Sequence, residues 1–217
     1  SVAEIATGNV TIFHDLKSMP KSLAADFITG IGVNNSASAS DGNIIGGNST
    51  DRALISFLIN ANAVNEMTKN EVRNFNAFDS NKKSSSVTLT RNGKIVTYVK
   101  GAPERIIPNC THYIDQDGER KKLVELNYLT AYMDTQAGRS MRLLAVAMAD
   151  GEDDNHDLTL VGIISIRDNV RKEAADAIKE VQNAGIQVVM VTGDRKETAA
   201  AISKEAGLLS RETDIVL

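Results

Sequence analysis

The sequence predicts an α/β protein with two parts: an antiparallel sheet with flanking helices over residues 1–160, then a partial parallel α/β half over residues 161–217. Short alternating segments joined by tight turns fill the first part, as in antiparallel sheets. After about residue 160, two continuous apolar runs (VGIISI and IQVVMV) alternate with helical patterns. Such runs are typical of parallel strands that are buried on both faces.

The first sixty residues contain two predicted strands and two predicted helices. Alternating apolar residues within the first fifteen positions indicate one or two strands. A short helix is expected within residues 20–32, and a long exposed loop over the small polar residues 34–49. A second helix is predicted to begin at Thr50 and Asp51, because apolar residues recur behind them at helical spacing: Ala53, Leu54, Phe57, Leu58 and Ala61.

A β-hairpin over residues 86–99 is the clearest local prediction, since Asn92–Gly93 suits the tight turn between two alternating segments. Pro103 is expected in the first turn of a short helix. Asp117–Gly118 predicts a further turn, residues 126–133 a helix, and residues 142–148 a buried strand.

The second part begins with the apolar run 161–166, followed by an amphipathic helix that Gly185 is placed to end. The run 186–191 is expected to be a strand buried on both faces. Asp194, with Glu197 three residues later, predicts the start of another helix by a capping-box pattern. Residues 215–217 are expected to begin one more strand.

Composition excludes several classes of protein. The formal net charge of −4 does not favour a nucleic-acid partner. A single cysteine, Cys110, rules out an internal disulfide and suits a reducing compartment. No apolar run reaches the roughly 18–20 residues that span a bilayer, and the first residues do not resemble a signal peptide. The chain has neither GxxxxGK[ST] nor a GxGxxG after a strand, so a nucleotide would need a different kind of pocket.

Two motifs indicate a family: KGAPE at residues 100–104 and MVTGD at residues 190–194. In this order they resemble the large cytoplasmic loop of a P-type cation-transporting ATPase, most closely a calcium pump. The resemblance implies a nucleotide-binding domain over 1–160 and part of a haloacid-dehalogenase-like phosphorylation domain over 161–217. The family's DKTGTLT and GDGxND signatures are absent from the sequence. We therefore expect a fragment that binds ATP and is inactive by itself.

The resemblance also implies a nucleotide site. Phe78 corresponds to a phenylalanine that stacks on adenine, and Lys83 to a lysine five positions later. Lys100 lines the adenine cleft in the family, where the following small residues allow the ligand to approach the backbone. The remaining matching positions are Gly101, Ala102, Arg142 (phosphate or ribose), and Thr50 with Asp51 (adenine amino group).

A second set matches the phosphorylation site of the family. Asp168 and Arg171 correspond to the charged ends of a hinge motif, and the aspartate helps to position nucleotide and Mg²⁺. Thr192, Gly193 and Asp194 follow a predicted strand and open a predicted helix, which is where anions bind in α/β sheets. In the family, these residues support the aspartyl phosphate and its Mg²⁺.

Each assignment has a structural alternative. Phe78 also suits a core position at a strand edge, and Lys100 a solvated strand end. Asp51 and Asp194 suit helix starts, and Arg142 an exposed strand position. For the whole chain, the alternatives are a non-catalytic interaction module and a haloacid-dehalogenase-like phosphatase fragment. The phosphatase would need a DxD-type nucleophile strand, which we do not find.

The resemblance implies a parent protein that couples ATP hydrolysis, through an aspartyl phosphate, to cation transport. The chain would be a cytoplasmic domain of this integral membrane protein, and its short loops indicate a bacterial plasma membrane. Expected partners are ATP and the rest of the pump (its actuator and transmembrane domains), with Mg²⁺ as cofactor. The incomplete second sheet also predicts a dimer formed through its open edge.

Overall fold

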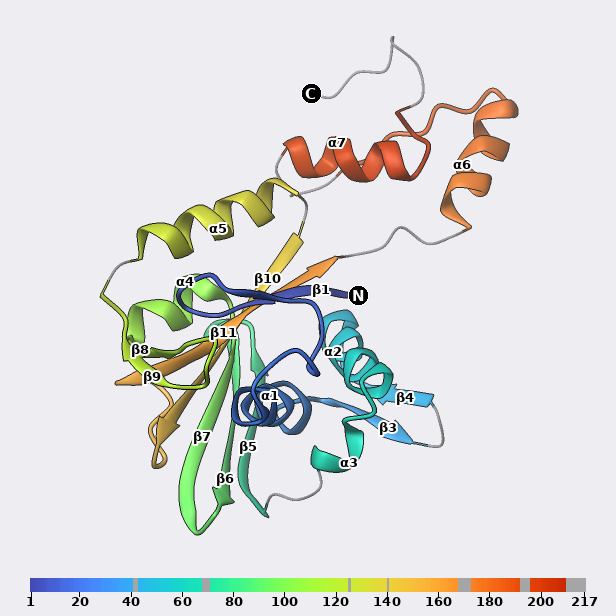
Figure 1. Ribbon diagram of the computed structural model, residues 1–217. Helices are drawn as coiled ribbons and strands as arrows, with labels where there is room; N and C mark the ends of the chain where they lie inside the picture. Colours follow the sequence, from blue (N-terminus) through green and yellow to red (C-terminus); the bar gives the residue numbers. More distant parts are fainter. Residues whose placement is uncertain are drawn as a thin grey trace.

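The computed structural model describes residues 1–40, 43–67, 71–124, 126–139, 141–167, 173–191 and 196–209. Within these residues, nine strands form one sheet with helices packed on it (Figure 1). The strands of this sheet are β1 (Val2–Ala6), β2 (Ile12–Phe13), β5 (Glu71–Asp79), β6 (Ser84–Arg91), β7 (Lys94–Gly101), β8 (Cys110–Ile114), β9 (Arg120–Lys122), β10 (Met141–Asp150) and β11 (Leu158–Arg167). A separate pair is formed by β3 (Ala37–Ser40) and β4 (Asn43–Gly46).

The helices are α1 (Lys21–Ile28), α2 (Ser49–Asn60), α3 (Val64–Met67), α4 (Pro103–Ile106), α5 (Asn127–Gly138), α6 (Ala174–Asn183) and α7 (Lys196–Glu205). A π-helical turn, η1 (Thr29–Val33), continues α1, and a 3-10 turn, η2 (Ile107–Asn109), continues α4. None of the helices in the described residues is both long enough and apolar enough to span a membrane.

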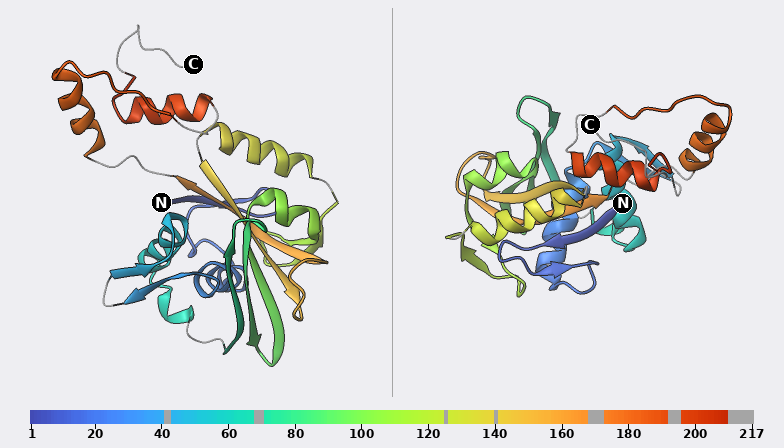
Figure 2. Two further views of the ribbon diagram at one scale, coloured as in Figure 1. Left: turned by 180° about the vertical axis from the view of Figure 1, so that it is seen from behind. Right: turned by 90° about the horizontal axis from the view of Figure 1, so that it is seen from above.

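The sheet is antiparallel along its main path, in the order β2-β1-β11-β10-β7-β6-β5, and β8 pairs with β11 in parallel. Alternate residues of β10 enter different cores. Val146 packs with residues of α1 and α2, whereas Ala145 and Ala147 pack with residues of α4 and α5. Helices therefore cover both faces of the sheet (Figure 2). The predicted antiparallel sheet with flanking helices is confirmed.

The local turn chemistry follows the prediction. The β6–β7 hairpin turns at Asn92 and Gly93, whose φ angles are 51° and 75°, as a type I′ turn requires. The Asp117–Gly118 turn joins β8 to β9, with Gly118 at φ 81°. Pro103 is in the first turn of α4. Gly185, at φ 76°, follows α6, and the amide of Ile186 donates to the carbonyl of Val181, which is a Schellman-type ending.

The expectation of a loop over residues 34–49 is wrong, although most of the described residues of this stretch are exposed, as predicted. Residues 37–40 and 43–46 pair as β3 and β4, and Asn34 is fully buried. Gly46 and Gly47 have positive φ angles of 72° and 65°, so glycine here serves a compact turn into α2. Composition alone did not separate this hairpin from a loop, because its strands are short and built of small residues.

The run 161–166 is a strand, as predicted, but its expected place in a parallel half is wrong. It does not open a parallel half but lies in β11, paired antiparallel with both β1 and β10. The run 186–191 is not a strand, and Ile186, Val189 and Val191 are exposed. Within residues 173–191 and 196–209, the structure contains α6 and α7 and no strand. The expected helix start at Asp194 and the strand at 215–217 lie outside the described residues.

Two register shifts shape β5, which is the edge strand next to β6. They lie at residues 72–74 and 76–79. Each inserts an extra residue into β5, as β-bulges do, and each reverses the normal alternation of side chains. Val72, Phe75 and Phe78 are three positions apart, and the two bulges place all three on one face of the sheet.

That face also carries Lys100. Phe75 pairs with Val87, and Val87 pairs with Tyr98, which precedes Lys100 by two positions. Directly paired residues share a face, and so do residues two apart in a strand. We call this side of β5, β6 and β7 the Lys100 face.

Ser1, which precedes β1, lies beside Arg167, the last residue of β11. The amide of Arg167 donates to the carbonyl of Ser1 (2.8 Å), and the amino group of Ser1 donates to the carbonyl of Arg167 (2.7 Å). Residues 1 and 167 are thus joined through the β1–β11 pair.

Candidate functional site

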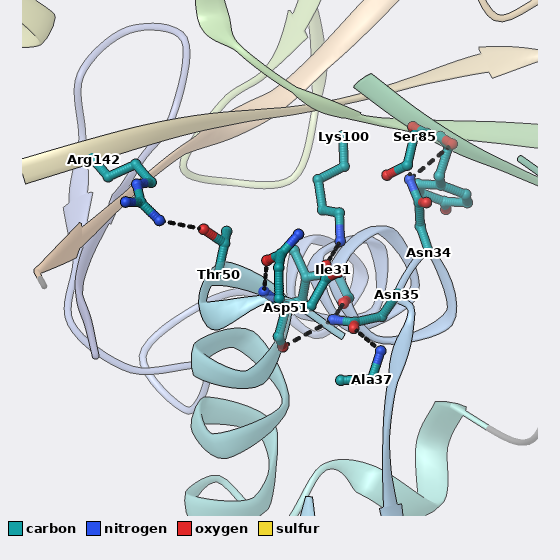
Figure 3. Close-up of polar contacts among 11 residues, drawn as sticks. Ile31, Asn34, Asn35, Ala37, Thr50, Asp51, Ser85, Lys100 and Arg142 are labelled. Atoms are coloured by element: carbon teal, nitrogen blue, oxygen red, sulfur yellow. Dashed lines mark hydrogen bonds and ion pairs between the residues drawn. The ribbon is translucent and has the colours of Figure 1, made fainter. Parts of the chain in front are cut away.

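The first turn of α2 holds one part of the candidate site. Asn48 caps the helix, because its Oδ1 accepts a hydrogen bond from the amide of Asp51 (2.9 Å). Asp51 therefore does not cap the helix but lies within its first turn, with only 5% of its surface exposed. Its Oδ1 is 2.7 Å from Nζ of Lys100, which extends from β7 (Figure 3).

The Lys100–Asp51 ion pair is buried, and Lys100 is 4% exposed. Burial lowers the pKa of Lys100 below its ordinary value, while the Asp51 carboxylate opposes this shift. Among the described residues, Asp51 is the acceptor for Lys100 Nζ, although an ammonium has three N–H donors. A buried cation with donors to spare suits a ligand that brings further acceptors.

Thr50 and Arg142 meet next to this pair. Nη1 of Arg142, from β10, donates to Oγ1 of Thr50 at 2.8 Å (Figure 3), and lies 3.4 Å from Oγ of Ser49. The structure therefore brings together four residues that the sequence predicted as site residues: Thr50, Asp51, Lys100 and Arg142. Two adjacent residues of α2 hold two cations that come from different strands.

Two asparagines that the sequence analysis did not single out lie beside this group (Figure 3). Nδ2 of Asn35 donates to the carbonyls of Ile31 and Asp51, and its Oδ1 accepts from the amide of Ala37. Asn35 thus ties η1 and β3 to α2. Two consecutive asparagines within residues 34–49 could have indicated a structural role, since an asparagine side chain can both donate hydrogen bonds to the backbone and accept them from it.

Asn34 fixes η1 against the sheet. Its Nδ2 donates to the carbonyl oxygens of Ser85 (3.1 Å) and Tyr98 (3.3 Å). Oδ1 of Asn34 and Oγ of Ser85 are buried without a hydrogen-bond partner among the described residues. Unpaired polar atoms of this kind cost about 1–3 kcal/mol each.

A second group of predicted site residues, Lys83, Gly101 and Ala102, lies together at the end of β7. The amide of Ala102 donates to the carbonyl of Lys83 (3.0 Å), so the two backbone segments touch. A Cβ on Gly101 would overlap the Lys83 carbonyl oxygen and lie 2.8 Å from Cα of Ser84. Glycine is therefore required here by close packing. The Lys83 side chain forms an exposed ion pair with Glu104 (3.2 Å).

Phe78 shares a face of the sheet with Lys100. Asp79 pairs with Ser84, so alternation puts its neighbour Phe78 on the other face, the Lys100 face. Half of the Phe78 surface is exposed, and Phe75 on the same face is 39% exposed. The predicted alternative, a core residue at a strand edge, is right about the edge strand but not about burial.

The remaining predicted site residues lie outside the described residues: Asp168, Arg171, Thr192, Gly193 and Asp194. Within the described residues, no group of three or more His, Cys, Asp or Glu side chains is arranged to hold a metal ion. The described residues therefore include only the first predicted set: Thr50, Asp51, Phe78, Lys83, Lys100, Gly101, Ala102 and Arg142.

Several known proteins are similar to this chain in sequence. Residues 25–173 match the family model described as P-type ATPase, cytoplasmic domain N. Calcium-transporting ATPase 7, plasma membrane-type, of Oryza sativa subsp. japonica is 35% identical over 78% of the chain and 18% of its own length. Plasma membrane calcium-transporting ATPase 1 of Gallus gallus is 30% identical over 92% of the chain and 19% of its own length.

A bacterial relative is similar to a comparable degree. The probable cation-transporting P-type ATPase of Mycoplasma genitalium is 33% identical over 65% of the chain and 16% of its own length. The chain thus spans about a fifth of the length of the curated relatives that it matches. Because the family model covers more than half of the chain, this chain belongs to the P-type ATPase family, and it contains the cytoplasmic domain N.

Proposed function

We propose that the chain binds ATP as the nucleotide-binding part of a calcium-type P-type ATPase. The observation that carries the proposal is the position of Lys100. It is a buried cation with donors to spare, at the end of β7 and on the same face as the half-exposed ring of Phe78. An aromatic ring and a lysine on one face suit a purine base.

In this proposal, Phe78 stacks on the adenine ring and Lys100 donates to its ring nitrogens. Asp51 orients Lys100 through the 2.7 Å ion pair. The guanidinium of Arg142 binds phosphate or ribose through its fork of donors. The other contributing residues are Thr50, Lys83, Gly101 and Ala102.

The parent protein would couple ATP hydrolysis through an aspartyl phosphate to cation transport, with Asp168, Arg171, Thr192, Gly193 and Asp194 near the transferred phosphoryl group. Mg²⁺ would neutralise charge on that group. We expect the chain alone to have no ATPase activity. Its domains would be the predicted nucleotide-binding and partial phosphorylation domains, with the boundary moved from residue 160 to the end of β11, since β11 belongs to the first sheet.

The chain would act at the cytoplasmic side of a membrane, together with the actuator and transmembrane domains of the pump. Self-association through the second part is supported only by the exposure of Ile186, Val189 and Val191; a monomer in light scattering would contradict it. The relatives named above come from a plant, a bird and a bacterium, so they lend no support to the bacterial origin expected from the sequence.

The test is an ATP titration followed by amide chemical shifts, with wild-type protein and Phe78→Ala. We expect a Kd on the order of millimolar, about −4 kcal/mol, with shifts around Phe78, Lys83 and Lys100 that the substitution weakens. Val72→Ala is the matched control, since Val72 lies on the same face and is equally exposed (49%). Failure of the shifts to saturate at several millimolar ATP would favour the interaction module instead.

A further inference from the structure

A chain of hydrogen bonds on the far side of the sheet reaches the strand that carries Phe78. Nδ2 of Asn76 donates to Oγ of Ser86 (3.1 Å), and Oγ of Ser86 donates to Oδ2 of Asp154 (2.9 Å). The three residues come from β5, β6 and the β10–β11 connection. Because Asn76 and Ser86 are directly paired, the chain runs across the strands on the face opposite to Lys100.

Ser86 is the centre of this chain. It is 4% exposed, and its single hydroxyl is a donor to Asp154 and an acceptor from Asn76. A hydrogen bond to a carboxylate is stronger than one between neutral groups, and hydrogen bonds in a chain polarise one another. Loss of the Ser86 hydroxyl would therefore break both bonds at once.

The acceptor, Asp154, is on a connection that is itself fixed to the sheet. The amide of Gly151 donates to the carbonyl of Ile95 (2.9 Å), and Oγ1 of Thr97 donates to the carbonyl of Gly151 (2.8 Å). Two bonds to β7 thus hold the start of the connection. Asp154 therefore lies three residues after a point at which the connection is bonded to β7.

These hydrogen bonds meet β5 directly beside its second bulge. Asn76 is the last paired residue before the second bulge, and Phe78 lies within that bulge. The far end of the bulge is fixed at Asp79, whose carbonyl accepts from the amide of Lys83 (2.7 Å) and whose Oδ1 accepts from the amide of Asn81 (2.7 Å). Hydrogen bonds therefore fix β5 on both sides of its second bulge, at Asn76 and at Asp79.

The second bulge determines the face on which Phe78 lies, and few other contacts fix β5 in place. All nine residues of β5 are exposed, and among the described strands β5 pairs with β6 alone. If the extra residue between Asn76 and Asp79 were lost, regular alternation would carry Phe78 to the opposite face, since a slip of one residue exchanges the faces of a strand.

We propose that Asn76, Ser86 and Asp154 are positioning residues for the nucleotide site, which hold the second bulge of β5 so that Phe78 faces Lys100. They act through Phe78 and do not touch the nucleotide. The inference rests on the proposed function, because it assumes that Phe78 stacks on the base.

The experiment is a double-mutant cycle between Ser86→Ala and Phe78→Ala, with ATP affinity measured from amide shifts. Ser86→Ala alone should raise the Kd for ATP about five- to tenfold. In the Phe78→Ala background, the same substitution should leave the Kd unchanged, because the ring that it positions is absent. Equal effects of Ser86→Ala in both backgrounds would overturn the inference.

Conservative substitutions provide a second test of the same proposal. Ser86→Thr keeps the hydroxyl and should restore wild-type affinity, and Asp154→Asn, which keeps an acceptor, should weaken binding less than Asp154→Ala. The matched control is Thr90→Ala, which removes another side-chain bond between β5 and β6, from Nε of Arg73 to Oγ1 of Thr90 (2.8 Å). This bond lies at the first bulge of β5 and not at the second. A Thr90→Ala effect as large as that of Ser86→Ala would mean that any loosening of β5 suffices, and would overturn the proposal.

The effect on the register of β5 is measured in the absence of nucleotide. Cross-strand nuclear Overhauser contacts between Asp79 and Ser84 report the register beyond the bulge, and they should weaken in Ser86→Ala but not in Thr90→Ala. Wild-type protein that binds no ATP would end both this inference and the proposed function. Binding by wild type and Ser86→Ala with the same Kd would end this inference alone.

Discussion

Lys100 and Asp51, 49 positions apart in the sequence, form a buried ion pair of 2.7 Å that joins the end of β7 to the first turn of α2. Each charge is excluded from water and depends on the other. The pair thus connects the sheet to the helix layer at the place where the candidate nucleotide site lies.

Removal of one member of this pair should be costly. We expect Asp51→Leu to lower the free energy of unfolding by about 3–5 kcal/mol, since it leaves a buried ammonium without its counter-charge. The double variant Asp51→Leu/Lys100→Met should recover most of that loss. Urea unfolding followed by circular dichroism measures both. As a control, Lys83→Met breaks an exposed ion pair and should lower the free energy of unfolding by no more than about 1 kcal/mol. A loss as small as this for Asp51→Leu would refute the expectation.

Alkaline pH should destabilise the protein through two buried tyrosines. Burial raises the pKa of Tyr98 and Tyr132 above their ordinary value of 10.0. Their contribution to stability is complete below pH 10 and is lost as the pH rises toward their folded-state pKa, because the unfolded chain releases its protons first. The free energy of unfolding should fall above pH 10 by up to about 1.4 kcal/mol per pH unit for each tyrosine.

Tyr132→Phe should reduce this slope, as measured by denaturant unfolding between pH 9 and 11.5. Tyr128→Phe is the matched control, because Tyr128 lies one turn away on the same helix and is largely exposed. Equal slopes for Tyr132→Phe and the wild type would show that the buried hydroxyl does not control alkaline unfolding.

Gly101→Ala should destabilise the fold at the end of β7. The new methyl group would overlap the backbone of Lys83 and Ser84, and overpacking of this kind typically costs about 1–3 kcal/mol. Thermal unfolding would detect the loss. Gly138→Ala is the control: nothing lies within 4 Å of the added Cβ, and alanine in a helix is favoured over glycine by roughly 0.5–1 kcal/mol. An unchanged melting temperature for Gly101→Ala would contradict the packing argument.

Cys110 should react slowly with a thiol reagent. Partial burial raises the pKa of its thiol to about 12, so the reactive thiolate is much rarer at pH 8 than in the unfolded chain. Since Cys110 is the only cysteine, colorimetric labelling with and without denaturant compares the two reaction rates. Native labelling at nearly the denatured rate would contradict this expectation.

The turns, the helices and the antiparallel sheet were predictable, because residues such as Asn92–Gly93 and Pro103 determine local backbone geometry. The strand β5 was not predicted, since its apolar residues recur every three positions instead of every two. Only the bulges, visible in the pairing with β6, place Val72, Phe75 and Phe78 on one face. Tertiary structure thus created a pattern that the sequence alone does not show.

The run at residues 161–166 shows a different limit. A continuous apolar segment indicates that both faces of a strand are covered, and β11 is indeed buried on both sides. It does not indicate the direction of the neighbouring strands. In the site, family resemblance identified Asp51 and Lys100 separately, but their contact depends on how α2 packs against β7.

The contact between Ser1 and Arg167 has a mechanical consequence. Both ends of this 167-residue stretch are at one place, in adjacent antiparallel strands. A force that separates these two ends would peel β1 from β11 one hydrogen bond at a time instead of loading all of them together. The stretch should therefore yield at low tension when pulled by residues 1 and 167, and resist more strongly when pulled by residue 1 and the β6–β7 turn, a difference that single-molecule stretching can measure.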